Sequence, residues 1–553
     1  MSREDGGLDR RAFVGQVALW GAAAFEGKVQ LSSVAQRLQA RGRFSPSREP
    51  FAFEEATVAG LQAEMAAGRL SAADIVEHYL GRIEQLDRKG PSLHSIIELN
   101  PDAHRLAEEL DRERKQKGPR GPLHGIPVLL KDNIDTADRM TTTAGSLALE
   151  GSVALRDAGV AARLRAAGAV LLGKANMSEW ANIRSTHSTS GWSARGGQCR
   201  NPYVLDRNPC GSSSGSAVAV AANLVPIAVG TETDGSIVCP ASATGIVGLK
   251  PTVGLVSRAG IIPISHTQDT AGPLCRSVAD AATLLGALAG ADSRDSATAA
   301  SQGHRQADYT RYLDSGGLQG ARIGVARSRF FGYSDTVDRL AGEALELLRG
   351  GGAVLVDPAD VPHAGDYDSE ELEVLLYEFK VDLASYLAEL GPQVRVKNLG
   401  DVIQFNEQHR EREMPYFGQE LFLEAEKKGP LSSAGYRKAL HTCRRRSRSL
   451  GIDAVMRRHR LDALVAPTGN PAWPTDLVNG DHFVGGSSTP AAVAGYPSIS
   501  VPMGFVSGLP VNLSFFGPAW SEPVLIRMAY AYEQASRHRR PPRFLPSIAL
   551  SPG

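Results

Sequence analysis

The chain has 553 residues, of which 42% are hydrophobic and 22% are charged, a composition typical of a folded protein with a large buried core. Its 60 basic and 60 acidic side chains cancel, so no net charge favours nucleic acid, an anionic membrane or a polyanionic substrate as a partner. The five cysteines form no Cys-x-x-Cys pair and are too few for a disulfide framework, although a single bridge is compatible with their number.

The first 24 residues have the features of an export signal. Arg10 and Arg11 form a twin-arginine pair, a weakly apolar stretch follows over 12–25, and small residues at 22–24 fit a cleavage site. This stretch is too short to span a bilayer, and no later segment reaches the roughly 18 apolar residues that a spanning helix needs. We therefore predict an exported protein, periplasmic or secreted, without stable membrane insertion. An amphipathic N-terminal helix in a cytoplasmic enzyme is the alternative.

Residues 25–50 are polar and irregular, which predicts an arm or linker before a folded domain over 51–545. In the domain, helical and strand patterns alternate, beginning with a capping box at 71–74 that predicts an amphipathic helix. Strands are expected at 125–131, 169–172, 227–229 and 461–467, and helices at about 159–167, 217–223 and 277–288. This alternation favours an α/β layered fold with helices on both faces of a large sheet.

The segment at about 335–459 has longer helical patterns and predicts a mostly helical insertion. Within 370–390, for example, Leu372, Leu375 and Phe379 recur at helical spacing. Because the insertion stands between two α/β segments, we expect it to cover a site.

Two serines in glycine-rich sequence and one lysine suggest nucleophilic catalysis. Ser212 lies in 210–216, Ser236 lies in 230–237, and Lys131 ends the apolar run at 125–131. A serine hydroxyl must be activated by a base, and no histidine adjoins either serine in the sequence. A buried lysine can serve as the base, because desolvation favours its neutral amine. We predict Ser236 as nucleophile, Lys131 as base and Ser212 as a proton relay between them.

The residues just before the predicted nucleophile suit oxyanion stabilisation. Thr233, Asp234, Gly235 and Ser236 form a short turn in which glycine removes steric obstruction from the backbone N–H groups. We expect these N–H groups to bind the substrate oxygen. The 13 histidines show no His-Glu-x-x-His or related metal spacing, and we expect neither a metal nor an organic cofactor.

Two other motifs suggest different functions, but each fails a structural requirement of its motif. Residues 211–215 also satisfy Gly-x-Ser-x-Gly, which would make Ser213 a nucleophile, but that motif follows a strand and 205–209 has the composition of a loop. Residues 168–174 nearly match a phosphate-binding loop, but Ala175 stands where Ser or Thr is required and 169–172 has a strand pattern.

The glycine- and serine-rich segments together resemble the amidase signature family over about 51–534. The matching segments are 124–127, 131–133, 211–216, 230–237, 245–252, 466–468 and 497–502. The resemblance implies a single large α/β domain with a mixed central sheet covered by helices. It also implies amide hydrolysis through an acyl-enzyme, with Ser236 as nucleophile, Ser212 (after a cis peptide bond) as bridge and Lys131 as base. The N–H groups of 233–236 would form the oxyanion hole.

Within that family, the segments at 210–215, 233–240 and 472–476 are most similar to the peptide amidases, which remove C-terminal amide groups from peptides. Ser214 and Asp234 depart from the commoner family pattern, which has glycine there, and peptide amidases share both departures. The resemblance implies a C-terminally amidated peptide as substrate, with ammonia released. The alternatives are aryl, fatty or other small amides, the glutamine-hydrolysing subunit of a tRNA-dependent amidotransferase, and a non-catalytic amide-binding protein.

Overall fold

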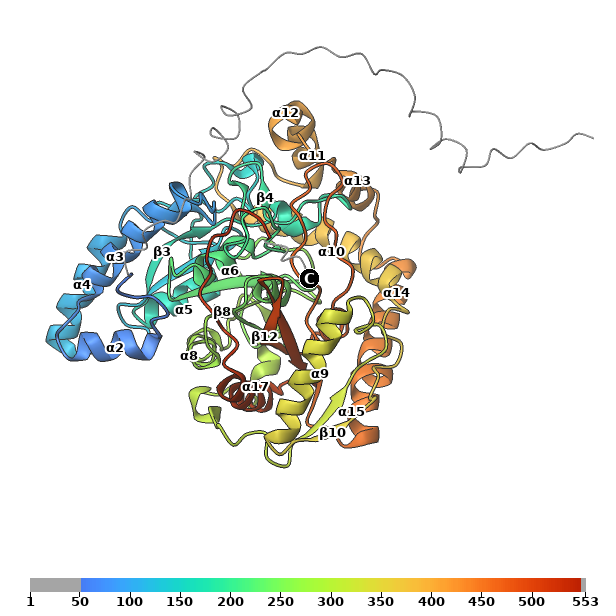
Figure 1. Ribbon diagram of the computed structural model, residues 1–553. Coiled ribbons are helices and arrows are strands. Elements are labelled where there is room, and N and C mark those ends of the chain that lie inside the picture. The colour runs from blue at the N-terminus through green and yellow to red at the C-terminus, as the bar shows by residue number, and fades with distance from the viewer. Residues whose placement is uncertain (1–50, 549–553) are drawn as a thin grey trace, which may run out of the picture. The chain divides into compact units, whose positions relative to one another are not determined.

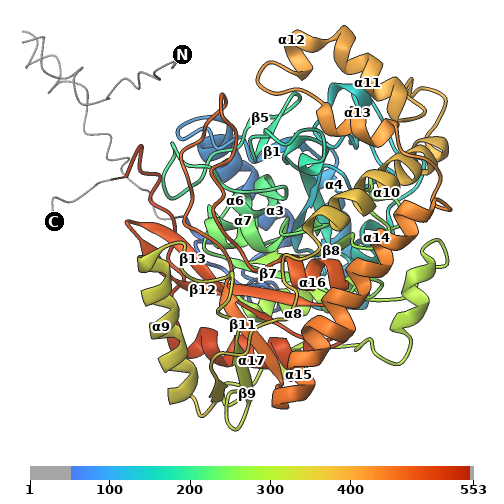
Figure 2. The ribbon, with the colours of Figure 1, turned by 90° about the vertical axis from the view of Figure 1, so that its right-hand side faces the viewer.

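A mixed sheet of eleven strands forms the centre of the molecule, as expected (Figures 1 and 2). In sheet order the strands are β1 (Ile96–Leu99), β3 (Val170–Ala175), β2 (Pro127–Lys131), β6 (Ile227–Glu232), β8 (Thr270–Cys275), β7 (Val247–Lys250), β12 (Ser498–Val506), β13 (Leu509–Phe516), β11 (Ala463–Pro467), β9 (Arg322–Val325) and β10 (Val354–Val356). β3, β2 and β6 run parallel, as do β11, β9 and β10, and the other neighbours are antiparallel.

The computed structural model describes residues 51–548, so the predicted export signal (1–24) and arm (25–50) lie outside the described residues. The described chain from Phe53 onward forms one compact unit. Within 51–548, no helix is both long enough and apolar enough to cross a membrane.

Helices cover the sheet, and α10 to α14 gather beside one another at one side of it (Figure 2). The α-helices are α2 (Val58–Ala66), α3 (Ala72–Ile83), α4 (Ala103–Lys117), α5 (Gly159–Ala166), α6 (Ser214–Ala221), α7 (Val238–Ala243), α8 (Val278–Leu288), α9 (Asp335–Gly350), α10 (Asp368–Glu389), α11 (Leu399–Gln408), α12 (Arg410–Glu413), α13 (Glu420–Glu426), α14 (Ala434–Arg444), α15 (Asp453–His459), α16 (Thr489–Ala494) and α17 (Glu522–Ser536). β10 comes from the segment expected to be mostly helical and pairs with β9 at the sheet edge.

The capping box predicts the start of α3 correctly. The Ser71 N–H donates to Asp74 Oδ2 at 2.8 Å, and the Asp74 N–H donates to Ser71 Oγ at 3.0 Å. These two bonds satisfy backbone donors that the first helical turn leaves unpaired. The buried face of the helix then carries Ile75, Val76 and Tyr79 against the rest of the domain.

The bounds of two strands predicted from apolar runs need correction. β3 and β6 extend beyond the expected apolar runs because the sheet also buries polar residues, among them Lys174 and Glu232. The fully buried Lys174 Nζ donates to the carbonyl of Ile134 at 2.6 Å, which compensates part of its lost hydration. The helical pattern at 370–390 does form α10, in which Leu372 is 37% exposed and Glu378 is buried.

One disulfide joins Cys210 to Cys239 in α7. We expect replacement of both cysteines by alanine to lower the free energy of unfolding by about 3–4 kcal/mol, because the bridge closes a loop across a sequence separation of 29 and restricts the unfolded chain. Denaturant unfolding of the double variant and of the oxidised wild type measures the difference. An unchanged transition midpoint with an unchanged slope would contradict this prediction.

Candidate active site

Lys131 ends β2 with a fully buried side chain. Its Nζ lies 2.7 Å from Ser212 Oγ, 2.9 Å from Thr231 Oγ1 and 3.2 Å from the Thr231 carbonyl oxygen. An ammonium would donate to all three oxygens, whereas a neutral amine donates to two and accepts a proton from a hydroxyl. Burial lowers the pKa of Lys131 to about 7, although the charges of Asp269 and Glu232 partly oppose this shift. A large fraction of the lysine is therefore neutral near neutral pH.

Ser212 is buried at the start of the segment that leads into α6. The peptide bond between Gly211 and Ser212 is cis, as the family resemblance implied. A Cβ atom at position 211 would collide with Ser178 Oγ, so a side chain there would force a shift that glycine avoids. The carbonyl of Ser212 also accepts from the Ser178 N–H at 3.1 Å. These contacts fix the backbone that presents the Ser212 hydroxyl to Lys131.

Ser213 is tied to the end of β6. Its Oγ accepts from the Thr231 N–H at 3.1 Å and lies 3.0 Å from the Thr231 carbonyl oxygen. Its own N–H donates to the carbonyl of Ser236 at 3.2 Å. The hydroxyl of Ser213 is therefore engaged by the backbone of Thr231. The residues before Ser213, at 208–210, are irregular and do not form a strand. A Gly-x-Ser-x-Gly nucleophile motif requires a strand directly before the serine, and 208–210 do not provide one.

Ser236 stands in the loop between β6 and α7 and is 8% exposed. Gly235 precedes it with a φ of +75°, a conformation that side chains other than glycine rarely adopt. Among residues 51–548, the Ser236 hydroxyl has no hydrogen-bond partner. The structure thus joins Lys131 to Ser212 directly and connects Ser236 to the same segment through the backbone of Ser213.

The backbone N–H groups of Thr233, Asp234, Gly235 and Ser236 donate to no acceptor within the described part of the chain. The neighbouring N–H groups do have a partner, because the Glu232 carboxylate accepts from Ile237 N at 2.7 Å and from Val238 N at 3.0 Å. Four consecutive unpaired donors beside a hydroxyl can bind an anionic oxygen. We call residues 233–236 the oxyanion loop.

Side chains of the oxyanion loop are anchored elsewhere in the fold. Thr233 Oγ1 donates to Asp269 Oδ1 at 2.6 Å, and Asp234 Oδ2 accepts from Thr489 Oγ1 at 2.6 Å. Burial raises the pKa of Asp269 to about 6, against the effect of its hydrogen bonds. The anchored side chains leave the loop backbone free to face a substrate.

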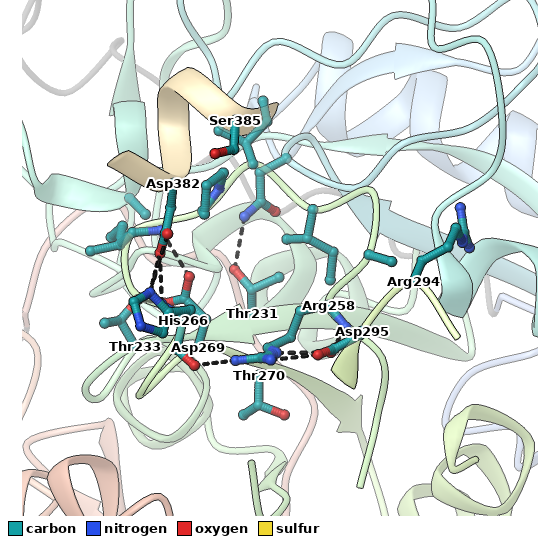
Figure 3. Close-up of a pocket in the computed structure, with 17 residues that line it drawn as sticks. Thr231, Thr233, Arg258, His266, Asp269, Thr270, Arg294, Asp295, Asp382 and Ser385 are labelled. Carbon is teal, nitrogen blue, oxygen red and sulfur yellow. Dashed lines mark hydrogen bonds and ion pairs between the residues drawn. The ribbon is translucent and has the colours of Figure 1, made fainter. Parts of the chain in front are cut away.

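A cavity of about 260 Å³ adjoins this region (Figure 3). Thr231 and Thr233 line it, together with the apolar stretch 261–264. Its charged lining residues are largely paired: Arg258 bonds Asp295 at 2.5 Å, for example, and His266 bonds Asp382 at 2.9 Å. The cavity can therefore take an apolar group next to the oxyanion loop.

Sequence reasoning named Lys131 and both serines but gave no role to Thr231, Asn133 or Asp269. Thr231, which binds the Lys131 amine, stands in the same glycine-rich segment as Ser236, so its proximity to the site could have been suspected. Asn133 Nδ2 in turn donates to Thr231 Oγ1 at 3.0 Å. Asp269 carries no motif and reaches Thr233 only through the fold of a distant segment.

Comparison with known proteins defines the class. A family model described as Amidase matches residues 74–526. A probable amidase of Arabidopsis thaliana is 45% identical, with 90% of this chain and 93% of that protein covered. A glutamyl-tRNA(Gln) amidotransferase subunit of Halorhodospira halophila is 36% identical, with 87% of this chain and 97% of that protein covered.

Among solved structures, the native peptide amidase from Stenotrophomonas maltophilia is 55% identical with a TM-score of 0.86, covering 90% of this chain and 100% of that one. A peptide amidase in complex with the competitive inhibitor chymostatin is equally similar and covers 89% of this chain and 100% of that one. The protein is thus an amide-hydrolysing enzyme. It belongs to the amidase signature family, as its sequence segments implied.

Proposed function

We propose that the enzyme hydrolyses the C-terminal carboxamide of peptides and releases ammonia. The observation that carries the mechanism is the 2.7 Å contact between a buried, readily neutralised Lys131 and Ser212, next to the unpaired N–H groups of the oxyanion loop. In this mechanism the Ser236 hydroxyl, which is unpaired among residues 51–548, turns toward Ser212 when substrate binds. Lys131 then accepts the proton of Ser212 as Ser212 accepts that of Ser236. Ser236 Oγ then bonds to the carboxamide carbon, and the carbonyl oxygen takes the negative charge.

The N–H groups of Thr233 to Ser236 stabilise that oxyanion, and removing one such donor typically costs about 3–4 kcal/mol of transition-state stabilisation. When the tetrahedral intermediate collapses, the C–N bond breaks and the proton returns through Ser212 to the leaving nitrogen, which departs as ammonia. Water repeats the sequence on the resulting ester, so that a peptide carboxylate leaves and Ser236 regains its proton. The chain's own residues supply every proton transfer in this scheme.

The substrate assignment is supported by the higher identity to peptide amidases, 55% against 36% for the amidotransferase subunit. The cavity beside Thr231 and Thr233 adds support, because its apolar wall at 261–264 suits an uncharged side chain of a peptide. The amidotransferase function is the second candidate, since that relative matches along nearly its full length.

Ammonia release from a substrate panel tests the assignment. We expect kcat/KM for peptide amides with an apolar C-terminal residue to exceed that for acyl anilides, simple aliphatic amides and free glutamine by at least about tenfold, because only peptide amides fill the cavity while reacting. The matching free peptide acid serves as the blank for ammonia. Preferred hydrolysis of free glutamine would favour the amidotransferase function, and a preference for anilides would favour an arylamidase.

A further inference from the structure

Three acidic residues of α10 contact the same loop. Glu371, Glu378 and Asp382 are spaced by seven and four residues, which places them on one face of a helix with 3.6 residues per turn. Each accepts a hydrogen bond from the segment 265–268. The contacts are Gln268 Nε2 to Glu371 Oε1 at 2.8 Å, Ser265 Oγ, Thr267 N and Thr267 Oγ1 to Glu378 Oε2 at 2.5, 3.2 and 3.0 Å, and His266 N to Asp382 Oδ2 at 2.9 Å. Figure 3 shows Asp382 reaching from the helix to His266.

Glu378 is the central member of this acidic face and is fully buried. Its other oxygen, Oε1, accepts from the Tyr436 hydroxyl of α14 at 2.6 Å. A buried carboxylate is costly unless donors surround it, and here both oxygens are occupied. The contact between α10 and the loop is therefore specific, because shifting the loop would leave Oε2 of Glu378 without its donors.

The loop in turn holds the oxyanion loop at Thr233. Asp269 Oδ2 accepts from Ile264 N at 2.8 Å and Ser265 N at 2.9 Å, while its Oδ1 accepts from Thr233 Oγ1 at 2.6 Å. Gln268 Nε2 also donates to the Thr233 carbonyl at 3.4 Å. In a trans peptide unit the C=O and N–H point in opposite directions. A donor on the Thr233 carbonyl thus helps to fix the direction of the next N–H, that of Asp234.

We propose that α10 acts through the 264–269 loop as a brace that orients the N–H groups of the oxyanion loop. Glu378, Gln268 and Asp269 are positioning residues in this brace, and none of them needs to touch the substrate. The proposal rests on the proposed role of residues 233–236 in binding the oxyanion. It gives the inserted helical segment a part in catalysis, because the chain of contacts leads from α10 to the peptide group beside the nucleophile.

A positioning role predicts a particular kinetic signature. Preorganised donors act on the charge that develops in the transition state, so a loosened oxyanion loop should lower kcat while substrate binding changes little. A peptide aldehyde reports the same interaction, because Ser236 adds to its carbonyl and leaves a tetrahedral oxygen facing the loop. The peptide acid product lacks that oxygen geometry and reports ground-state binding.

The main test compares Glu378→Ala, Glu378→Gln and the wild type. For Glu378→Ala we expect kcat to fall by about 10–100-fold, aldehyde affinity to fall by a similar factor and product affinity to stay within about twofold. Glu378→Gln should recover most of the loss, because its amide oxygen can accept from Ser265 and Thr267 while its NH₂ donates to Tyr436. Glu373→Gln is the matched control on the same helix. Glu373 pairs with Lys428 and not with the loop, so wild-type values are expected.

Thr233→Val cuts the same chain of contacts at its far end and is nearly isosteric. It should likewise weaken aldehyde binding while leaving product affinity nearly unchanged. The double variant with Glu378→Ala should lose less kcat and aldehyde affinity than the two single losses combined. Thr233→Val alone provides the test if Glu378→Ala fails to fold. Equal loss of aldehyde and product affinity, full additivity, or wild-type kcat in a folded Glu378→Ala enzyme would overturn the brace. An active Ser236→Ala enzyme would instead overturn the proposed function itself.

Discussion

Ser236→Ala is expected to reduce ammonia release by about 10⁴–10⁶-fold, because the variant lacks the oxygen that forms the acyl-enzyme. The thermal midpoint should change little, since the Ser236 hydroxyl has no hydrogen-bond partner within residues 51–548. A fluorophosphonate probe, which reacts covalently with activated serines, should label the wild type and not this variant. Quantitative turnover and mass spectrometry of the labelled protein measure both effects.

Ser213→Ala is the control that distinguishes Ser236 from Ser213 as the nucleophile. Among residues 51–548 the Ser213 hydroxyl hydrogen-bonds only to the backbone of Thr231, so the variant should be less stable but should still carry the probe on Ser236. If the probe labels Ser236→Ala but not Ser213→Ala, then Ser213 is the nucleophile instead of Ser236. Undiminished turnover in Ser236→Ala would remove the acyl-enzyme mechanism altogether.

Lys131→Met is expected to lower kcat by about 10²–10⁴-fold, the range typical of a lost general base, with a smaller change in KM. Methionine fills much of the buried volume without the amine that contacts Ser212 and Thr231. Lys174→Met is the matched control, because Lys174 is an equally buried lysine on the neighbouring strand whose amine contacts Ile134 and Thr142 rather than a serine.

We expect Lys174→Met to lose stability but to keep most of its kcat in the folded fraction. The Lys174 amine of the wild type hydrogen-bonds to Ile134 and Thr142, away from the two serines. Steady-state kinetics alongside thermal unfolding separates the two kinds of loss. Wild-type kcat in Lys131→Met, or an equal loss of kcat in the folded Lys174 variant, would contradict the assignment of Lys131 as base.

Local patterns in the sequence predicted much of the fold and the residue types of the site. The capping box at Ser71 and the apolar run ending at Lys131 each depend on neighbours in the chain, and both elements form as expected. The pairing of Cys210 with Cys239 could not be predicted, because five cysteines allow many pairings and only the fold brings these two together.

The residues that hold the site in place, such as Glu378 and Asp269, were also not predictable, and the reason is different. A glutamate on a helix normally faces solvent, and the helical spacing of the nearby leucines gives no sign that Glu378 is buried. Glu378 is buried because donors from the distant 265–267 segment surround it. Such compensation depends on tertiary contacts between segments far apart in sequence, which periodicity does not encode. The contact of Asp269 with Thr233 follows the same rule.

The most direct test of the central claim, that a neutral buried amine starts the reaction, is the pH dependence of kcat/KM for the wild type. Because the pKa of Lys131 is lowered to about 7, the rate should rise as pH increases through that value and then level off as the amine becomes neutral. Asp269, with a pKa of about 6, titrates nearby, so the profile should be repeated at several temperatures. An amine pKa falls markedly on warming, whereas a carboxyl pKa hardly moves. A rising limb near pH 7 that shifts with temperature is the predicted result, and a profile that is flat through this range or falls with increasing pH would contradict the account.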